Sequence, residues 1–105
     1  MTQDDRYKSN SQQRIVKILL FLGGHEVNGL APGEIANGLS ITPNNVTHDL
    51  ANLRLAGVAE QLPESGRWRL TPRVPQIAMA MLNGISRAES KTNEVKNRFT
   101  RNPHS

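Results

Sequence analysis

The sequence predicts a mainly α-helical domain that carries one small β-hairpin. Apolar residues recur at helical spacing in several segments, and good helix-starting residues precede or begin these segments. After Gly57 the period of the apolar residues changes to two, which is typical of strands. A length of 105 residues, of which 36% are hydrophobic, leaves room for one domain with a modest core.

The positive charge of the chain is unevenly distributed. The formal net charge is +4, but residues 1–66 contain five cations and seven acids, a balance of −2. Residues 67–105 contain eight cations and two acids, a balance of +6. The basic second part therefore favours a polyanionic partner such as nucleic acid.

Composition also excludes several classes of protein. The chain has no cysteine, which excludes disulfide scaffolds, cysteine-based zinc sites and thiol nucleophiles. The longest apolar run, 15–22, is interrupted by Lys17 and is shorter than the ~20 residues of a membrane span. The polar N-terminus does not look like a secretory signal. We therefore expect a soluble, cytoplasmic protein with no membrane partner.

The first helix is expected from about Asn10 to Leu22, after a flexible segment at 1–9. Ser9 and Gln12 can form a capping box at its start, and Gly23 can end it. Four apolar residues recur on one face of this helix: Ile15, Ile18, Leu19 and Leu22.

Two further helices are expected before the hairpin. Pro32 suits the first position of the second helix, because a missing N–H group costs nothing there. The third helix has Thr42 as N-cap and Pro43 at its first position, runs over about 43–56, and stops at Gly57.

The hairpin is expected from strands at 58–62 and 67–71, joined by a turn at 63–66. A fourth helix is expected over 75–90, because apolar residues continue at helical spacing there. Residues 91–105 are expected to form a basic, mobile tail.

Two short helices, a third helix with its own cap and a basic hairpin are the parts of a winged helix-turn-helix, expected over 10–74. Several short motifs stand in the order typical of one family: Glu34-Ile35-Ala36, Val46, Asp49-Leu50-Ala51-Asn52-Leu53, Gly57 and Gly66-Arg67-Trp68-Arg69-Leu70-Thr71-Pro72-Arg73. On these residues, the segment 13–80 resembles the N-terminal DNA-binding domain of the IclR family of bacterial transcriptional regulators.

The chain also departs from that family. Ser40 stands where the family usually has glycine in the turn before the third helix, and His48 replaces a common arginine. The large C-terminal effector-binding domain of the family is absent, so no small-molecule effector is expected.

The resemblance implies that the third helix reads DNA in the major groove. Its face opposite Val46, Leu50 and Leu53 is polar and nearly uncharged. Asparagine can bind adenine with two hydrogen bonds, each such pair being worth about 1–3 kcal/mol of discrimination. The candidate base- or phosphate-contacting residues are Asn44, Asn45, Thr47, His48 and Asn52. The alternative is that Asn44 and Asn45 are merely solvated residues of a helix start.

Phosphate contacts are expected from Arg54 at the edge of the third helix and from Arg67 and Arg69 on the exposed face of the wing strand. A solvated strand face is the alternative for the two wing arginines. Trp68 alternates with them and is expected in the core. Leu55 falls on the outward face of the third helix, where a wing or a partner would have to cover it.

The fourth helix has two interpretations. Its apolar stripe can pack back on the first helix, or it can form a homodimer seam through Ile77, Met81, Leu82 and Ile85. The helix after the wing contributes to dimerisation in the resembled family, which favours the homodimer. A two-fold dimer predicts a palindromic site with half-sites ~34 Å apart.

No enzymatic motif is present. The three histidines lack metal-ligand spacing, the glycines do not form a phosphate-binding loop, and no nucleophile stands with a base, so we expect neither catalysis nor a cofactor. The leading hypothesis is a transcriptional regulator, bacterial or phage, that binds double-stranded DNA. The alternatives are a winged-helix protein-interaction module and a phage or plasmid replication or accessory factor.

Overall fold

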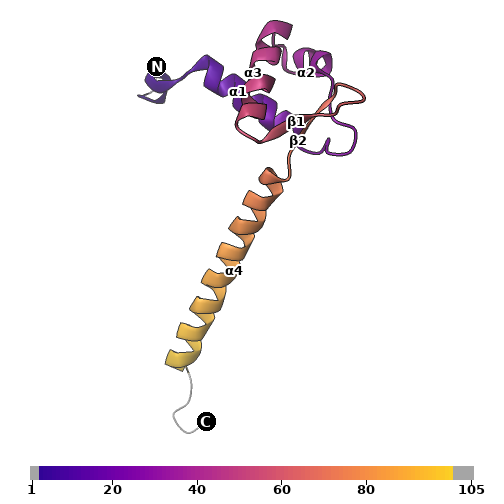
Figure 1. The fold of residues 1–105 in the computed structure, drawn as a ribbon. Helices are drawn as coiled ribbons and strands as arrows, with labels where there is room; N and C mark the ends of the chain where they lie inside the picture. Colours follow the sequence, from indigo (N-terminus) through magenta and orange to yellow (C-terminus); the bar gives the residue numbers. More distant parts are fainter. Residues whose placement is uncertain (1–2, 101–105) are drawn as a thin grey trace. The chain divides into compact units, whose positions relative to one another are not determined.

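A computed structural model describes residues 3–100 of the chain. A short 3-10 helix, Gln3–Tyr7, precedes three α-helices: α1 (Asn10–Leu22), α2 (Pro32–Leu39) and α3 (Pro43–Leu55). A hairpin of β1 (Ala59–Gln61) and β2 (Trp68–Leu70) follows, and then a long helix α4 (Arg73–Thr100) (Figure 1). The chain divides into two units, an N-terminal unit that ends at Arg73 and a second unit that begins at Val74.

The predicted starts of the first three helices and the predicted cap residues Ser9 and Thr42 agree with the observed ones, whereas the fourth helix begins at Arg73 and not at residue 75. The Ser9 hydroxyl accepts a hydrogen bond from the Gln12 N–H group at 3.4 Å, and the Thr42 hydroxyl accepts one from the Asn45 N–H group at 3.3 Å. These side chains satisfy amide groups that have no partner within the first turn of a helix. Because each cap lies within three residues of its partner, it could be predicted from the sequence.

The core of the N-terminal unit lies between α1, α2, α3 and the hairpin, which Figure 1 shows grouped together. Trp68 is buried, as predicted from its alternation with the arginines. The residues of this core come from all of these elements and from the segment before α2: Ile18, Leu22, Leu30, Ile35, Ala36, Val46, Leu50, Leu53, Ala59 and Trp68.

The hairpin is antiparallel, with Ala59 opposite Leu70 and Gln61 opposite Trp68. Its strands are shorter than the predicted ranges 58–62 and 67–71. Leu30 adds an isolated bridge to the far side of Trp68, through two backbone hydrogen bonds of 2.8 Å. The segment before α2 is thereby fixed to the hairpin.

Two backbone conformations are needed for this arrangement. Gly29 has φ +69°, and a Cβ atom added there would lie 2.7 Å from the Trp68 carbonyl oxygen, so only glycine fits beside the bridge. Ser40 ends α2 in the left-handed region with φ 54° and ψ 47°. This is the position at which the resembled family usually has glycine.

The predicted end of the fourth helix is wrong. The helix was expected to end near residue 90, but α4 continues to Thr100. Most of the segment expected to be a tail is therefore helical, and residues 101–105 of that predicted tail lie outside the described residues. None of the helices among residues 3–100 has both the length and the apolar character needed to span a membrane.

Candidate nucleic-acid interface

Helix α3 buries one face and presents the opposite face to solvent. Val46, Leu50 and Leu53 are buried in the core, as predicted. The outward face is defined by Asn44, Thr47, His48, Ala51, Asn52 and Leu55, and all of these except the half-buried Ala51 are exposed. Asn45 is half-buried at the edge of this face. Of the predicted base-contacting residues, Asn45 is thus the least accessible.

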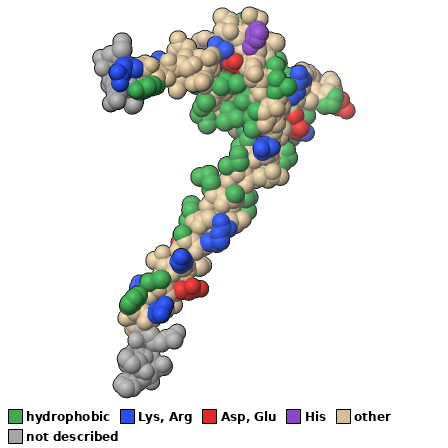
Figure 2. Space-filling view, turned by 60° about the vertical axis from the view of Figure 1, so that its left-hand side comes forward, with side chains coloured by type: hydrophobic (Ala, Val, Ile, Leu, Met, Phe, Trp, Pro, Cys, Tyr) green, Lys and Arg blue, Asp and Glu red, His purple; other side chains and the backbone are tan. Residues whose placement is uncertain are grey.

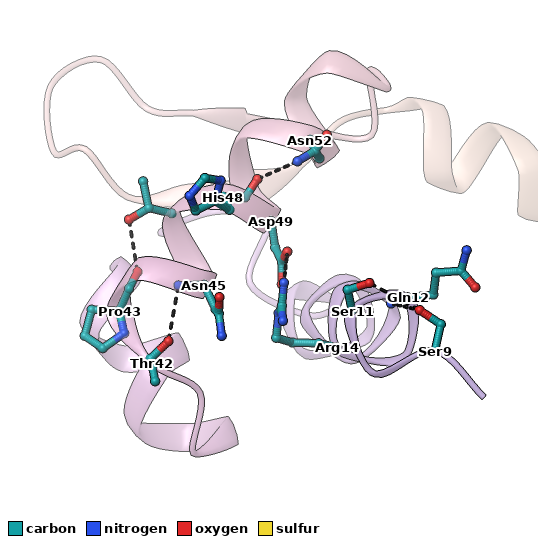
Figure 3. Close-up of polar contacts among 11 residues, drawn as sticks. Ser9, Ser11, Gln12, Arg14, Thr42, Pro43, Asn45, His48, Asp49 and Asn52 are labelled. Atoms are coloured by element: carbon teal, nitrogen blue, oxygen red, sulfur yellow. Dashed lines mark hydrogen bonds and ion pairs between the residues drawn. The ribbon is translucent and has the colours of Figure 1, made fainter. Parts of the chain in front are cut away.

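The outward face offers unused hydrogen-bonding groups. Thr47 donates its hydroxyl to the Pro43 carbonyl at 3.0 Å, and Asn52 donates one amide hydrogen to the His48 carbonyl at 2.9 Å (Figure 3). Within the described part of the chain, the side chains of Asn44 and His48 have no hydrogen bond. A ligand at this surface could therefore bond to both without breaking an internal contact.

An ion pair between the half-buried Arg14 and the buried Asp49 joins α1 to α3. Asp49 is 4% exposed, and its two carboxylate oxygens accept hydrogen bonds from Nε of Arg14 at 2.5 Å and from Nη2 of Arg14 at 2.9 Å (Figure 3). The bond with Asp49 raises the pKa of Arg14. No role for either residue was predicted, although a carboxylate on the core side of α3 signals a buried partner.

The two wing arginines are engaged within the protein, contrary to the expectation that they stand on an exposed strand face. Nη1 of Arg67 lies 2.7 Å from the Glu34 carboxylate, and two other nitrogens of Arg67 donate to the carbonyls of Asn28 and Gly29, each at 3.0 Å. The Ala31 N–H group and then Arg67 lower the pKa of Glu34. Arg67 therefore joins the wing to the start of α2 and to the segment before it.

Arg69 is engaged in the same way. Its Nε atom lies 2.8 Å from the Glu60 carboxylate on the paired strand, and its Nη1 atom donates to the Glu26 carbonyl at 3.4 Å. Both wing arginines are half-buried. A phosphate would have to compete with a carboxylate for either of them.

Arg54 differs from the wing arginines. It is exposed, it forms no ion pair among residues 3–100, and its guanidinium carbon lies 5.5 Å from the centroid of the Trp68 ring. The ring provides a surface on which a guanidinium group is held by cation–π attraction. Of the three predicted phosphate contacts, Arg54 is thus the one whose charge is available to a ligand.

Arg54 also borders an open groove of about 300 Å³ beside the outward face of α3. The groove runs between α3, the start of α2 and the hairpin, and it is lined by Pro32, Thr47, Leu50, Ala51, Arg54, Gln61 and Trp68. Thr47 and Arg54 therefore belong both to the groove and to the edge of the polar surface.

Comparison with solved structures adds information on the fold. No protein-family model matches the chain, and no curated protein matches it in sequence. The IclR family transcriptional regulator from Brucella abortus is similar in structure, with a TM-score of 0.66 and 24% identity over 79% of this chain. The chain covers 31% of that regulator.

Two smaller proteins are similar as well. The Zalpha domain of a Cyprinid Herpesvirus 3 protein, studied for its binding to Z-DNA, has a TM-score of 0.53 and 25% identity over 60% of this chain and all of its own length. The chain has a winged-helix fold. A MepR mutant from S. aureus, bound to an oligodeoxyribonucleotide, matches 92% of this chain and 78% of its own, with a TM-score of 0.54 and 17% identity. The N-terminal unit, which contains the three helices and the hairpin, is the winged-helix unit.

Proposed function

We propose that the winged-helix unit binds double-stranded DNA through the outward face of α3 and serves in transcriptional regulation. The observation that carries this proposal is the exposed, uncharged polar surface around Asn44 and His48, on a helix that the Arg14–Asp49 pair joins to α1. The similar proteins support it, because they include transcription regulators and proteins bound to DNA, and none of them is described as an enzyme.

In this proposal α3 lies in the major groove. The amide groups of Asn44 and Asn52 can each donate to and accept from an adenine edge, while Thr47 can contact a thymine methyl group. His48 donates to a guanine or to a phosphate. Asn45 is proposed as a contact at the margin, since it is half-buried.

Phosphate binding is proposed chiefly for Arg54, because its charge has no acidic partner in the described chain. Arg67 and Arg69 contribute only where a phosphate displaces Glu34 or Glu60 from them. Four of the five cations after residue 73 lie on α4, namely Arg87, Lys91, Lys96 and Arg98. The fifth, Arg101, lies outside the described residues.

Two copies are proposed to bind together as a homodimer through α4, with the predicted residues Ile77, Met81, Leu82 and Ile85 at the contact. All four are more than half exposed in the single chain. A two-fold dimer reads a palindromic sequence, with half-sites about one helical turn, ~34 Å, apart.

Selection of bound duplexes from a random pool tests binding, sequence preference and half-site symmetry together. We expect an enriched palindrome whose affinity falls as the salt concentration rises. Asn44→Ala and His48→Ala should relax the preference at single positions, and Gln13→Ala, which removes an exposed amide of α1, serves as the control. Failure to bind any duplex at low salt would overturn the proposal.

A second function, protein interaction through the same fold, is favoured by Leu55. This side chain is 84% exposed on the outward face of α3, and the wing arginines beside the hairpin are already paired. Leu55→Ser separates the two functions. Leu55 is the last residue of α3 and is not among the residues proposed to contact bases or phosphates, so the substitution should leave duplex selection unchanged if the surface reads DNA. It should abolish partner binding if the surface binds a protein.

A further inference from the structure

Apolar residues of α4 alternate at spacings of four and three along the whole helix. This 3.5-residue repeat is the signature of a coiled coil, in which the repeating positions form one seam facing another helix. The seam consists of Val74, Ala78, Met81, Ile85, Ala88, Thr92, Val95 and Phe99. Thr92 is its one polar member, and its hydroxyl already donates to the Ala88 carbonyl at 2.9 Å.

Among the described residues of its own unit, α4 has no other helix to cover the seam. α4 has 28 residues, a length of about 42 Å, and none of them is buried. Met81 is 63% exposed and Phe99 is 83% exposed, and Figure 2 shows hydrophobic side chains recurring along the helix. Most of the stability of such a helix has to come from packing its apolar stripe against a partner.

Shallow, open depressions lie between the side chains of α4, and two of them fall on the seam. One is outlined by Ala88, Lys91, Thr92, Val95 and Lys96, and another includes Ile85, Ala88, Glu89 and Thr92. Each contains four residues at positions i, i+3, i+4 and i+7, which is the arrangement that receives one side chain of a facing helix.

We propose that the seam binds α4 of a second copy of this chain in antiparallel orientation. The charge of α4 favours this orientation, because residues 74–86 carry no charge, whereas residues 87–100 carry four cations and two acids. A parallel pair would bring the two cationic halves together and place Lys91 of one chain beside Lys96 of the other. An antiparallel pair sets each cationic half against the neutral half of the partner.

Side-chain size favours the same orientation. When Val74 lies opposite the partner's Phe99, each small seam residue meets a larger one. Ala88 then lies opposite the partner's Ile85, Ala78 opposite the partner's Val95, and Thr92 opposite the partner's Met81. A parallel pair would instead place Ala78 opposite Ala78 and Ala88 opposite Ala88. Two layers of the seam would then contain only small side chains and would be poorly packed. Ile77 and Leu82, predicted at the contact, flank the seam.

The antiparallel pair also has a consequence that rests on the proposed DNA binding. The two Val74 residues, at which the winged-helix units are attached, lie about 38 Å apart along the pair. This spacing is close to the ~34–36 Å between half-sites one DNA turn apart. α4 would thus set the distance between the half-sites that two copies read.

Disulfide cross-linking of the full chain, without DNA, tests the seam and its orientation. The chain has no native cysteine, so only the introduced cysteines can form disulfides. Chains with Ala78→Cys and Val95→Cys are oxidised separately and as a mixture. We expect a cross-linked dimer in the mixture and little in either chain alone, since residue 78 meets residue 95 of the partner. Efficient cross-linking of either variant alone would overturn the antiparallel orientation.

Sedimentation of two aspartate variants provides the second measurement. Ile85 lies in the seam and Met79 on the outer side of α4, and both are 55% exposed in the single chain. We expect Ile85→Asp to weaken the dimer at least tenfold and Met79→Asp to leave it dimeric. A monomeric wild-type chain, as expected if α4 packs within its own chain, would overturn the proposal. The proposed DNA binding can fail without altering either measurement, so the two failures are distinguishable.

Discussion

Arg14 of α1 and Asp49 of α3 are joined by two side-chain hydrogen bonds across 35 positions of the chain. The pair is a polar link between α1 and α3, and the outward face of α3 is proposed to read DNA. It lies beside buried Val46 and Leu53, so its loss would leave a charge in an apolar environment.

The first prediction concerns this pair. Arg14→Met should lower the melting temperature by several degrees, because Asp49 then remains buried without its partner. The double variant Arg14→Met, Asp49→Leu should recover much of the loss, since it removes both charges. Thermal unfolding measured by circular dichroism provides the comparison. The coupling would be contradicted if the double variant lost as much stability as Arg14→Met and Asp49→Leu lose in total when each is made alone.

The second prediction concerns Ser40. Its left-handed conformation, with φ 54°, is unfavourable for a residue that has a Cβ atom. Ser40→Gly should therefore raise the free energy of unfolding by about 1 kcal/mol. Ser40→Ala is the control, because it keeps the Cβ atom and should give no gain in urea denaturation.

The third prediction contrasts two glycines. Gly29→Ala should destabilise the protein by about 2 kcal/mol or more, because the left-handed conformation is strained and the new methyl group meets the Trp68 carbonyl. Gly33→Ala, where the added Cβ has open space, should be neutral or stabilising by up to about 1 kcal/mol. Equal effects in chemical denaturation would argue against the close approach of Gly29 to β2.

The fourth prediction concerns pH. The pKa of Glu34 lies below its ordinary value of 4.5 in the folded chain, chiefly because its carboxylate accepts a hydrogen bond from Ala31 and also pairs with Arg67. A lowered folded pKa means that this contribution to stability is complete above the unfolded pKa and is lost as the pH falls through the folded pKa. The wild type should thus exceed Glu34→Gln in melting temperature at neutral pH, with the difference shrinking below about pH 4.5. A difference that stays constant with pH would exclude this linkage.

The fifth prediction separates the arginines. Arg54→Ala should weaken duplex binding and reduce the salt slope of log K by about 1, with little change in melting temperature. Arg67→Ala should mainly lower the melting temperature, because it removes an ion pair and two hydrogen bonds. Fluorescence anisotropy at several salt concentrations, with melting curves of both variants, measures this difference. A salt slope of Arg54→Ala equal to that of the wild type would show that Arg54 is not a phosphate contact.

The sequence alone determined the features that depend on neighbouring residues. Thr42 caps α3 through Asn45, Pro32 starts α2, and the outward face of α3 follows from the helical period. The length of α4 was also within reach, because its 3.5-residue repeat continues to Phe99; it was missed because cationic residues between the repeats were interpreted as a tail.

Only the tertiary structure decided which charges remain free. Arg67 and Arg69 alternate with Trp68 and Leu70, and Arg54 lies between Leu53 and Leu55. Nothing in these local sequences distinguishes an available guanidinium from a paired one. Arg67 finds the Asn28 carbonyl 39 positions away, just as Arg14 finds Asp49 across 35. Such partners meet only when the helices and hairpin pack, because the packing of the core fixes the distances between groups that are far apart in the chain.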